Sequence, residues 1–102
     1  MTRIVAYVPD LMDRSRISAA AGSRVAFVAT PAALAEAAAD TDLAIVDLGR
    51  PGVLDLLPKI SISSIGFASH VDRDLMAAAR AAGCDQVLAR SAFFARLGEL
   101  LA

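Results

Sequence analysis

Four polar side chains stand at or just after the ends of short apolar runs. They are two carboxylates, a hydroxyl and a guanidinium, contributed by Asp10, Asp47, Ser69 and Arg90. A carboxylate in such a place can accept a phosphoryl group, help to hold a metal ion, or take backbone N–H groups and an arginine as structural partners. Which of these chemistries applies depends on whether the fold brings the four side chains together.

Five short segments are rich in β-branched and other apolar residues, and we predict that they form β-strands. The predicted strands span residues 3–8, 24–28, 43–47, 62–68 and 86–89. Several are apolar at successive positions rather than at alternate ones. This pattern is typical of strands that are covered on both faces, as they are in parallel sheets.

Helices are predicted between and after the strands, at residues 10–20, 31–40, 53–57, 71–82 and 91–101. Asp10 is a suitable N-cap for the first helix, and Thr30 caps the second, in which Pro31 takes the first helical position. The third helix is the shortest, because Pro58 closes it. Gly83 follows the fourth and suits the left-handed conformation that ends a helix.

Strands that alternate with helices over short connections form a (βα)5 pattern. It predicts the α/β class, with a doubly wound open sheet of five parallel strands and helices on both faces. A chain of 102 residues suits a single domain, residues 1–102. Ligands of such sheets bind outside the carboxyl ends of the strands, near the point where the strand order reverses. We therefore expect the four polar residues to share one rim of the sheet.

Composition and charge narrow the function classes. The formal net charge is -1 and no run of Lys or Arg is present, so no nucleic-acid partner is expected. Acidic residues interrupt the apolar stretch 30–46, and the first apolar run is too short for a signal peptide, so neither membrane insertion nor secretion is expected. Cys84 is the only cysteine, which excludes an intramolecular disulfide and suits a cytoplasmic protein.

Motifs for cofactors and catalysis are missing. The loop VPDLMDRSR after the first predicted strand is neither a Ser/Thr-rich phosphate loop for FMN nor a G-x-G-x-x-G nucleotide loop, and no D-x-H-x-x-G cobalamin motif is present. His70 is the only histidine and is interpreted as a loop residue, while Cys84, which has no C-x-x-C partner, is interpreted as a packing residue. No cofactor, no bound metal, no catalytic residue and no enzymatic turnover are expected.

The sequence resembles the receiver domains of two-component response regulators over essentially its whole length. The segment LAIVDLGRPG, residues 43–52, is similar to the family's strand that ends in the phospho-accepting Asp, which places Asp47 at the acceptor position. The segment ASHVDRDLMAAARAAGCDQVLARSAF, residues 68–93, is similar to the family's second half, with Gly83 at a turn glycine. The resemblance implies a flavodoxin-like (CheY-like) fold with strand order 2-1-3-4-5.

The sequence departs from the family where receiver chemistry takes place. Receiver domains hold a magnesium ion with an acidic pair at the end of the first strand, and the matching residues here are Val8 and Pro9. Asp10 stands one step further along, a poor replacement because Mg²⁺ demands near-octahedral geometry. The strand-four hydroxyl, the strand-five aromatic and the Lys-Pro pair are here Ala68 with Ser69 adjacent, Val87 and Arg90-Ser91.

These departures favour a degenerate receiver, or pseudo-receiver, that serves as a non-catalytic regulatory or protein-interaction module. Asp47 is then a structural residue that accepts N–H groups of its loop and pairs with Arg90 across the rim. Two alternatives stay open. In one, the chain is an atypical single-domain response regulator phosphorylated at Asp47. In the other, Asp10, Asp47, Ser69 and Arg90 bind a small molecule, and the chain is a ligand sensor.

The expected partner is another protein or a second copy of this chain. Receiver domains commonly make contacts through the fourth helix, fifth strand and fifth helix. The fourth helix is expected to turn four residues outward, Arg73, Ala77, Arg80 and Ala81. Such a strip of small residues flanked by charge allows close approach.

The segment DLMDRSR, residues 10–16, mixes Asp13 with Arg14 and Arg16 and is interpreted as a solvated helical face with local ion pairs. Leu11 and Met12 are adjacent apolar residues in it. One of the two is expected to be exposed at the rim as a contact.

Overall fold

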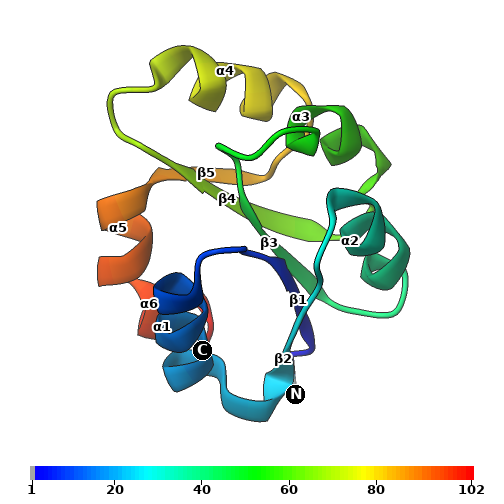
Figure 1. Cartoon of the computed structure of the whole chain (residues 1–102), viewed down its shortest axis with the longest axis vertical. Helices are drawn as coiled ribbons and strands as arrows, with labels where there is room; N and C mark the ends of the chain where they lie inside the picture. The colour runs from blue at the N-terminus through cyan, green and yellow to red at the C-terminus, as the bar shows by residue number, and fades with distance from the viewer. Residues whose placement is uncertain (1) are drawn as a thin grey trace.

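A computed structural model of the chain describes residues 2–102 and contains a parallel five-stranded sheet in the order β2-β1-β3-β4-β5 (Figure 1). The strands are β1 (Ile4–Tyr7), β2 (Val25–Phe27), β3 (Leu43–Asp47), β4 (Ser63–Ala68) and β5 (Gln86–Ala89). This is the flavodoxin-like, CheY-like arrangement, so the predicted fold class and strand order are confirmed. The strand order reverses beside β1, which lies between β2 and β3.

Helices cover both faces of the sheet. They are α1 (Leu11–Ala21), α2 (Pro31–Ala38), α3 (Val53–Leu56), α4 (Arg73–Ala81), α5 (Arg90–Ala95) and α6 (Leu97–Leu100), with 3-10 turns η1 (Gly22–Arg24) and η2 (Leu57–Lys59). The helices α2, α3 and α4 pack on one face, and α1, α5 and α6 pack on the other (Figure 1). Within residues 2–102, no helix is both long enough and apolar enough to cross a lipid bilayer.

The sheet separates two hydrophobic clusters because successive side chains of a strand point to opposite faces. In β1, Val5 and Tyr7 join the cluster beneath α2 to α4, whereas Ile4 and Ala6 join the cluster beneath α1, α5 and α6. The second cluster also holds Phe67 and Phe93, whose rings stack with centroids 4.8 Å apart. Both faces are thus covered, as the continuous apolar runs predicted.

The predicted helix caps are confirmed. The Asp10 side chain accepts the Asp13 N–H at the start of α1, and the Thr30 hydroxyl accepts the Ala33 N–H at the start of α2. Gly83 has a φ of 104°, the left-handed conformation that few other residues adopt.

Most helix boundaries differ from the predicted ones by one or two residues, and two of the differences have a clear structural cause. The fourth helix begins at Arg73 rather than at residue 71, because the Asp72 N–H bonds back to the Ser69 carbonyl and closes a turn first. The predicted helix 91–101 is split into α5 and α6 at Arg96, whose φ of -109° and ψ of 14° depart from helical values. Gly98, a poor helix former, lies in the short second piece.

The loop after β3 is anchored by Leu48, the residue that follows Asp47 in the chain. The Leu48 N–H donates to the Phe67 carbonyl at 3.0 Å, and its side chain, 1% exposed, folds over Gly66 of β4. A Cβ at Gly66 would lie 2.7 Å from Leu48 Cδ2 and 2.8 Å from its Cγ. The absence of a side chain at Gly66 therefore lets the chain turn over the sheet where Asp47 is presented.

Candidate functional site

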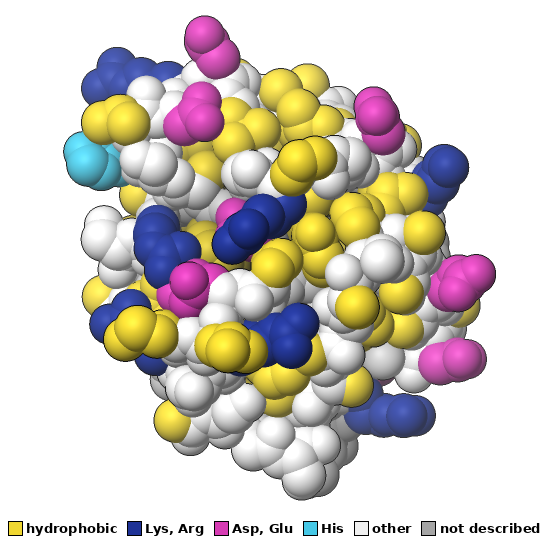
Figure 2. Space-filling model, viewed as in Figure 1, with side chains coloured by type: hydrophobic (Ala, Val, Ile, Leu, Met, Phe, Trp, Pro, Cys, Tyr) yellow, Lys and Arg dark blue, Asp and Glu magenta, His cyan; other side chains and the backbone are white. Residues whose placement is uncertain are grey.

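The carboxyl ends of the parallel strands form one rim, and the four polar residues predicted to gather there lie along it. Asp47 ends β3 and Ser69 follows β4, while Asp10 and Arg90 stand where α1 and α5 begin. Figure 2 shows Lys and Arg side chains gathered around a few acidic ones in the left centre of the face, with hydrophobic side chains between them. The rim is therefore a mixed surface of charges and apolar groups.

Asp47 is held by its own loop. Its Oδ1 accepts the Gly49 N–H at 3.1 Å, and its Oδ2 accepts a hydrogen bond from Arg50 Nε at 3.2 Å. The predicted bond to a loop N–H is confirmed. The predicted ion pair between Asp47 and Arg90 is wrong, because Arg50 reaches the carboxylate from only three residues away and Arg90 has another partner.

That partner is Asp13, on the buried side of α1. Its Oδ1 accepts a hydrogen bond from Arg90 Nη2, which joins residues 77 positions apart in the chain. The Asp13 side chain is 2% exposed, against 45% for Arg90. Its Oδ2 is also buried and has no hydrogen-bond partner among the residues described. Among residues 2–102, Arg90 is therefore the side chain that pairs with the charge of this acid.

The Arg90 guanidinium also lies over aromatic rings. Its Cζ is 5.1 Å from the ring centroid of Phe94 and 5.6 Å from that of Phe67. The hydrogen bond that Arg90 donates to Asp13 raises the pKa of Arg90 above its usual high value, and the charges of Asp13 and Asp47 add to this against the opposing effect of burial. Ring contacts and carboxylate together hold the cation at the end of β5.

The sequence interpretation of Asp13 as a solvated residue is wrong, and a signal in the sequence could have corrected it. Asp13 lies four residues before Ile17 and eight before Ala21, and all three are buried. Residues with this spacing share one helical face. Since Ile17 and Ala21 are apolar, Asp13 belongs to the face that packs on the sheet.

The arginines of the same segment do not form the local ion pairs that were predicted. Arg14 Nε donates to the Val8 carbonyl at 2.6 Å, and its guanidinium lies 5.3 Å from the Phe27 ring centroid. Arg16 Cζ lies 4.8 Å from the Phe94 ring centroid. Aromatic rings and a strand-end carbonyl therefore replace the expected acidic partners.

Asp10 serves as a helix cap. Its Oδ1 accepts the Asp13 N–H at 3.0 Å, and its backbone carbonyl accepts the Arg14 N–H at 3.0 Å. The side chain is exposed at the rim. Its negative charge suits the N-terminus of α1, where the helix dipole is positive.

Ser69, His70 and Cys84 show no sign of a chemical role in the structure. Ser69 and His70 are exposed in the loop that leads to α4. Cys84 is buried, its Sγ lies 3.3 Å from the Gln86 carbonyl oxygen, and burial raises the pKa of its thiol. A buried thiol with a raised pKa is a poor nucleophile, which agrees with its interpretation as a packing residue.

The rim does not suit the magnesium ion that a resemblance to receiver domains implies. Mg²⁺ takes a near-octahedral set of oxygen ligands. The strand end offers the buried apolar side chain of Val8 and then Pro9, while Asp13 and Asp47 are each paired with an arginine. Among residues 2–102, no three His, Cys, Asp or Glu side chains are grouped so that they could hold a metal ion.

Two exposed surfaces flank the rim. On α4, all four residues predicted to point outward are exposed, namely Arg73, Ala77, Arg80 and Ala81. At the start of α1, Leu11 is 74% and Met12 78% exposed, so both apolar side chains face solvent where only one was expected to.

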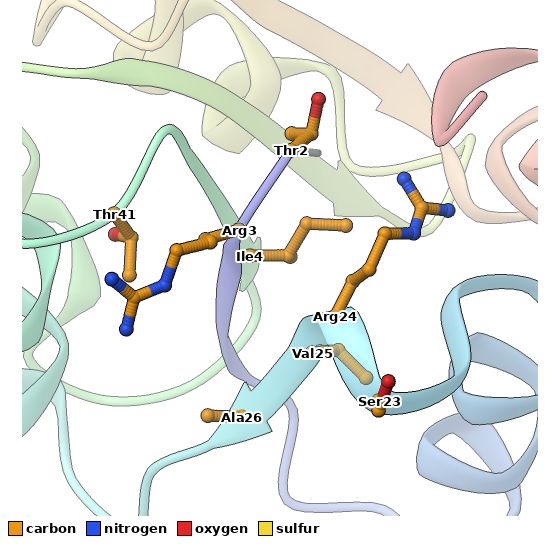
Figure 3. A pocket seen from close by; sticks show the side chains of 8 residues that line it. All are labelled: Thr2, Arg3, Ile4, Ser23, Arg24, Val25, Ala26 and Thr41. Atoms are coloured by element: carbon orange, nitrogen blue, oxygen red, sulfur yellow. The ribbon is translucent and has the colours of Figure 1, made fainter.

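A cavity of about 410 Å³ lies at the end of the sheet opposite the rim, near the amino ends of β1 and β2. Its lining includes Arg3 and Arg24, but Figure 3 shows their guanidinium groups pointing away from each other. Arg24 Nη2 instead donates to the Leu101 carbonyl at 2.6 Å and ties the last helical turn to η1. This cavity therefore lacks convergent polar groups.

Solved structures share this fold. The phosphorylated cyanobacterial phytochrome response regulator RcpA matches with a TM-score of 0.77 and 16% identity, over 98% of this chain and 88% of that one. FixJ-N matches with a TM-score of 0.70 and 21% identity, over 100% of this chain and 98% of that one. No protein-family model matches the chain, and no curated protein matches it either. The chain thus has the fold of response regulator receiver domains, and at these identities the likeness shows the fold alone.

Proposed function

We propose that this chain is a pseudo-receiver, a cytoplasmic regulatory module that keeps the receiver fold, transfers no phosphoryl group and acts through contacts with proteins. The observation that carries this proposal is the set of partners at the rim. Asp47 is bound by Gly49 and Arg50, and the strand end beside it offers Val8 and Pro9 instead of acidic residues.

The physical reason lies in how a carboxylate is phosphorylated. The reaction depends on positive charge that neutralises the transferring group, which a magnesium ion supplies in most phosphoryl transfers. Here the positive charge at Asp47 comes from Arg50, which holds one of the two carboxylate oxygens, while the Gly49 N–H holds the other. Arg90, the cation at the family's lysine position, is bound to Asp13.

Acetyl phosphate with Mg²⁺ and intact-mass measurement test the proposal. We expect no mass gain for this chain under conditions in which a phosphorylatable receiver, run in parallel, gains one phosphoryl group. A gain of one phosphoryl group that is lost in Asp47→Asn would overturn the proposal and establish the alternative, an atypical response regulator phosphorylated at Asp47.

The contact surface proposed for this module is the outer face of α4. Arg73, Ala77, Arg80 and Ala81 are exposed there, and the two alanines leave room for the backbone of a second copy of the chain. Sedimentation velocity is expected to show self-association that Ala77→Glu abolishes, because the longer side chain fills the room that the alanine leaves and its charge is costly to bury. Ala19→Glu, an exposed position on α1, is the matched control. A monomer at all concentrations, unchanged by Ala77→Glu, would contradict self-association through α4.

A further inference from the structure

A second cavity, of about 430 Å³, lies beside the rim where α1 faces the start of α5. Arg16, Arg90, Ser91, Phe94 and Ala95 line it. Both charged residues in this lining are cations, and none of the lining residues is acidic. Neither Asp10 nor Asp47 belongs to the lining, so the cavity is separate from the loop that holds Asp47.

The two guanidinium groups share one aromatic ring. Arg16 Cζ lies 4.8 Å and Arg90 Cζ 5.1 Å from the ring centroid of Phe94. Cation–π attraction offsets part of the repulsion between the two positive charges. An anion between them would offset more of this repulsion, since it would attract both positive charges at once.

Hydrogen-bond donors remain free in this cavity. Arg90 gives one Nη2 bond to Asp13, and its other N–H groups have no acceptor among residues 2–102. Within the same residues, neither the Arg16 guanidinium nor the Ser91 hydroxyl forms a hydrogen bond. The guanidinium groups of Arg16 and Arg90 and the hydroxyl of Ser91, from α1 and α5, thus line one cavity with N–H and O–H donors that have no acceptor within residues 2–102.

We propose that this cavity binds a phosphate group, either inorganic phosphate or the phosphate of a small monoester. Guanidinium groups match phosphate oxygens with paired N–H bonds, and a tetrahedral anion can accept from both arginines and the serine hydroxyl at once. The volume lies within the range of about 300–1,000 Å³ found for small-molecule sites, so a monoester larger than inorganic phosphate fits. The inference does not depend on whether Asp47 is phosphorylated.

Titration of the ¹⁵N-labelled chain with inorganic phosphate, and separately with phenyl phosphate, tests the site at constant ionic strength. Saturable shifts are expected at the amides of Ser91, Phe94 and Arg16, with none at Gly49 or Arg50. Arg16→Gln is expected to raise Kd at least about tenfold, the effect of losing one charge-assisted donor group. Ser91→Ala leaves the ion pair between Asp13 and Arg90 intact, and it is expected to raise Kd less than Arg16→Gln does.

Arg73→Gln is the matched control, because it removes the same charge from an exposed arginine outside the cavity. It should leave Kd unchanged. Equal weakening by Arg73→Gln, shifts confined to the Asp47 loop, or no saturable shift with either probe would each overturn the site. Tighter binding of phenyl phosphate supports a monoester as the ligand, and tighter binding of inorganic phosphate supports the free anion.

Discussion

Two carboxylates at one rim, Asp47 and Asp13, are each paired with an arginine, but in opposite ways. Asp47 pairs with Arg50, three residues away, and keeps 13% of its side chain exposed. Asp13 pairs with Arg90, 77 residues away, and is 2% exposed with one oxygen unpartnered among the residues described. The first pair organises a loop, whereas the second joins the first turn of α1 to the start of α5, directly after the last strand.

The difference indicates which of the two ion pairs contributes more to the free energy of unfolding. A local, partly hydrated ion pair contributes little, because water competes for both charges. A buried acid with a single partner costs a great deal when that partner is removed. The ion pair of Asp47, the residue that resembles a reactive acid, should therefore contribute little to stability. The ion pair of Asp13, which the sequence patterns did not indicate as buried, should contribute much more.

The largest expected effect follows from removing the partner of the buried acid. Arg90→Gln should lower the free energy of unfolding by about 3 kcal/mol, because it leaves the Asp13 carboxylate buried without a compensating charge. Urea unfolding measures the change. The double variant Asp13→Asn/Arg90→Gln removes that charge and should recover more than half of the loss. A loss no larger than that of Arg50→Gln would break the contrast between the two pairs.

A smaller effect is expected where the sheet supports the Asp47 loop. Gly66→Ala places a methyl group within 2.9 Å of three atoms of the buried Leu48 side chain, so unfolding should become easier by about 2 kcal/mol. Gly98→Ala, where nothing lies within 4 Å of the added carbon, is the control and should be neutral or slightly stabilising. Thermal unfolding distinguishes the two. Equal stability of both variants would show that hydrogen bonds within the loop are enough to position Asp47.

The smallest effect belongs to the local pair itself. Arg50→Gln should change the free energy of unfolding by no more than about 0.5 kcal/mol, since Asp47 keeps its bond from Gly49 and its partner is 41% exposed. Arg96→Gln breaks another exposed pair of the same spacing, with Glu99, and serves for comparison. A loss above about 1 kcal/mol for Arg50→Gln alone would contradict this ranking.

The strands and helices could be predicted closely from the sequence because their signals are local, whereas the strand order was predicted from the resemblance to receiver domains. The runs 43–47 and 86–89 match β3 and β5, and Asp10, Thr30 and Gly83 act at helix ends as predicted. The missed boundaries have equally local causes, such as the turn in which the Asp72 N–H bonds to Ser69.

The site could be predicted only in part. Composition and order placed Arg90 and Asp47 on the same rim, yet which acid Arg90 binds depends on how deeply α1 seats Asp13 against the sheet. No short segment of sequence encodes that depth. The aromatic rings beneath Arg90 also come from two elements, Phe67 from β4 and Phe94 from α5, so they meet only when the chain is folded.

The bond between Asp13 and Arg90 has a consequence for how the protein is made. During synthesis the first helix leaves the ribosome long before residue 90 exists, so Asp13 cannot pair with Arg90 while most of the chain is being translated. Until Arg90 is available, the Asp13 carboxylate is more stable in water than buried against the sheet. The first helix can therefore dock fully only once Arg90, at the start of α5, is available, which makes this docking a late step in the folding of this half of the protein.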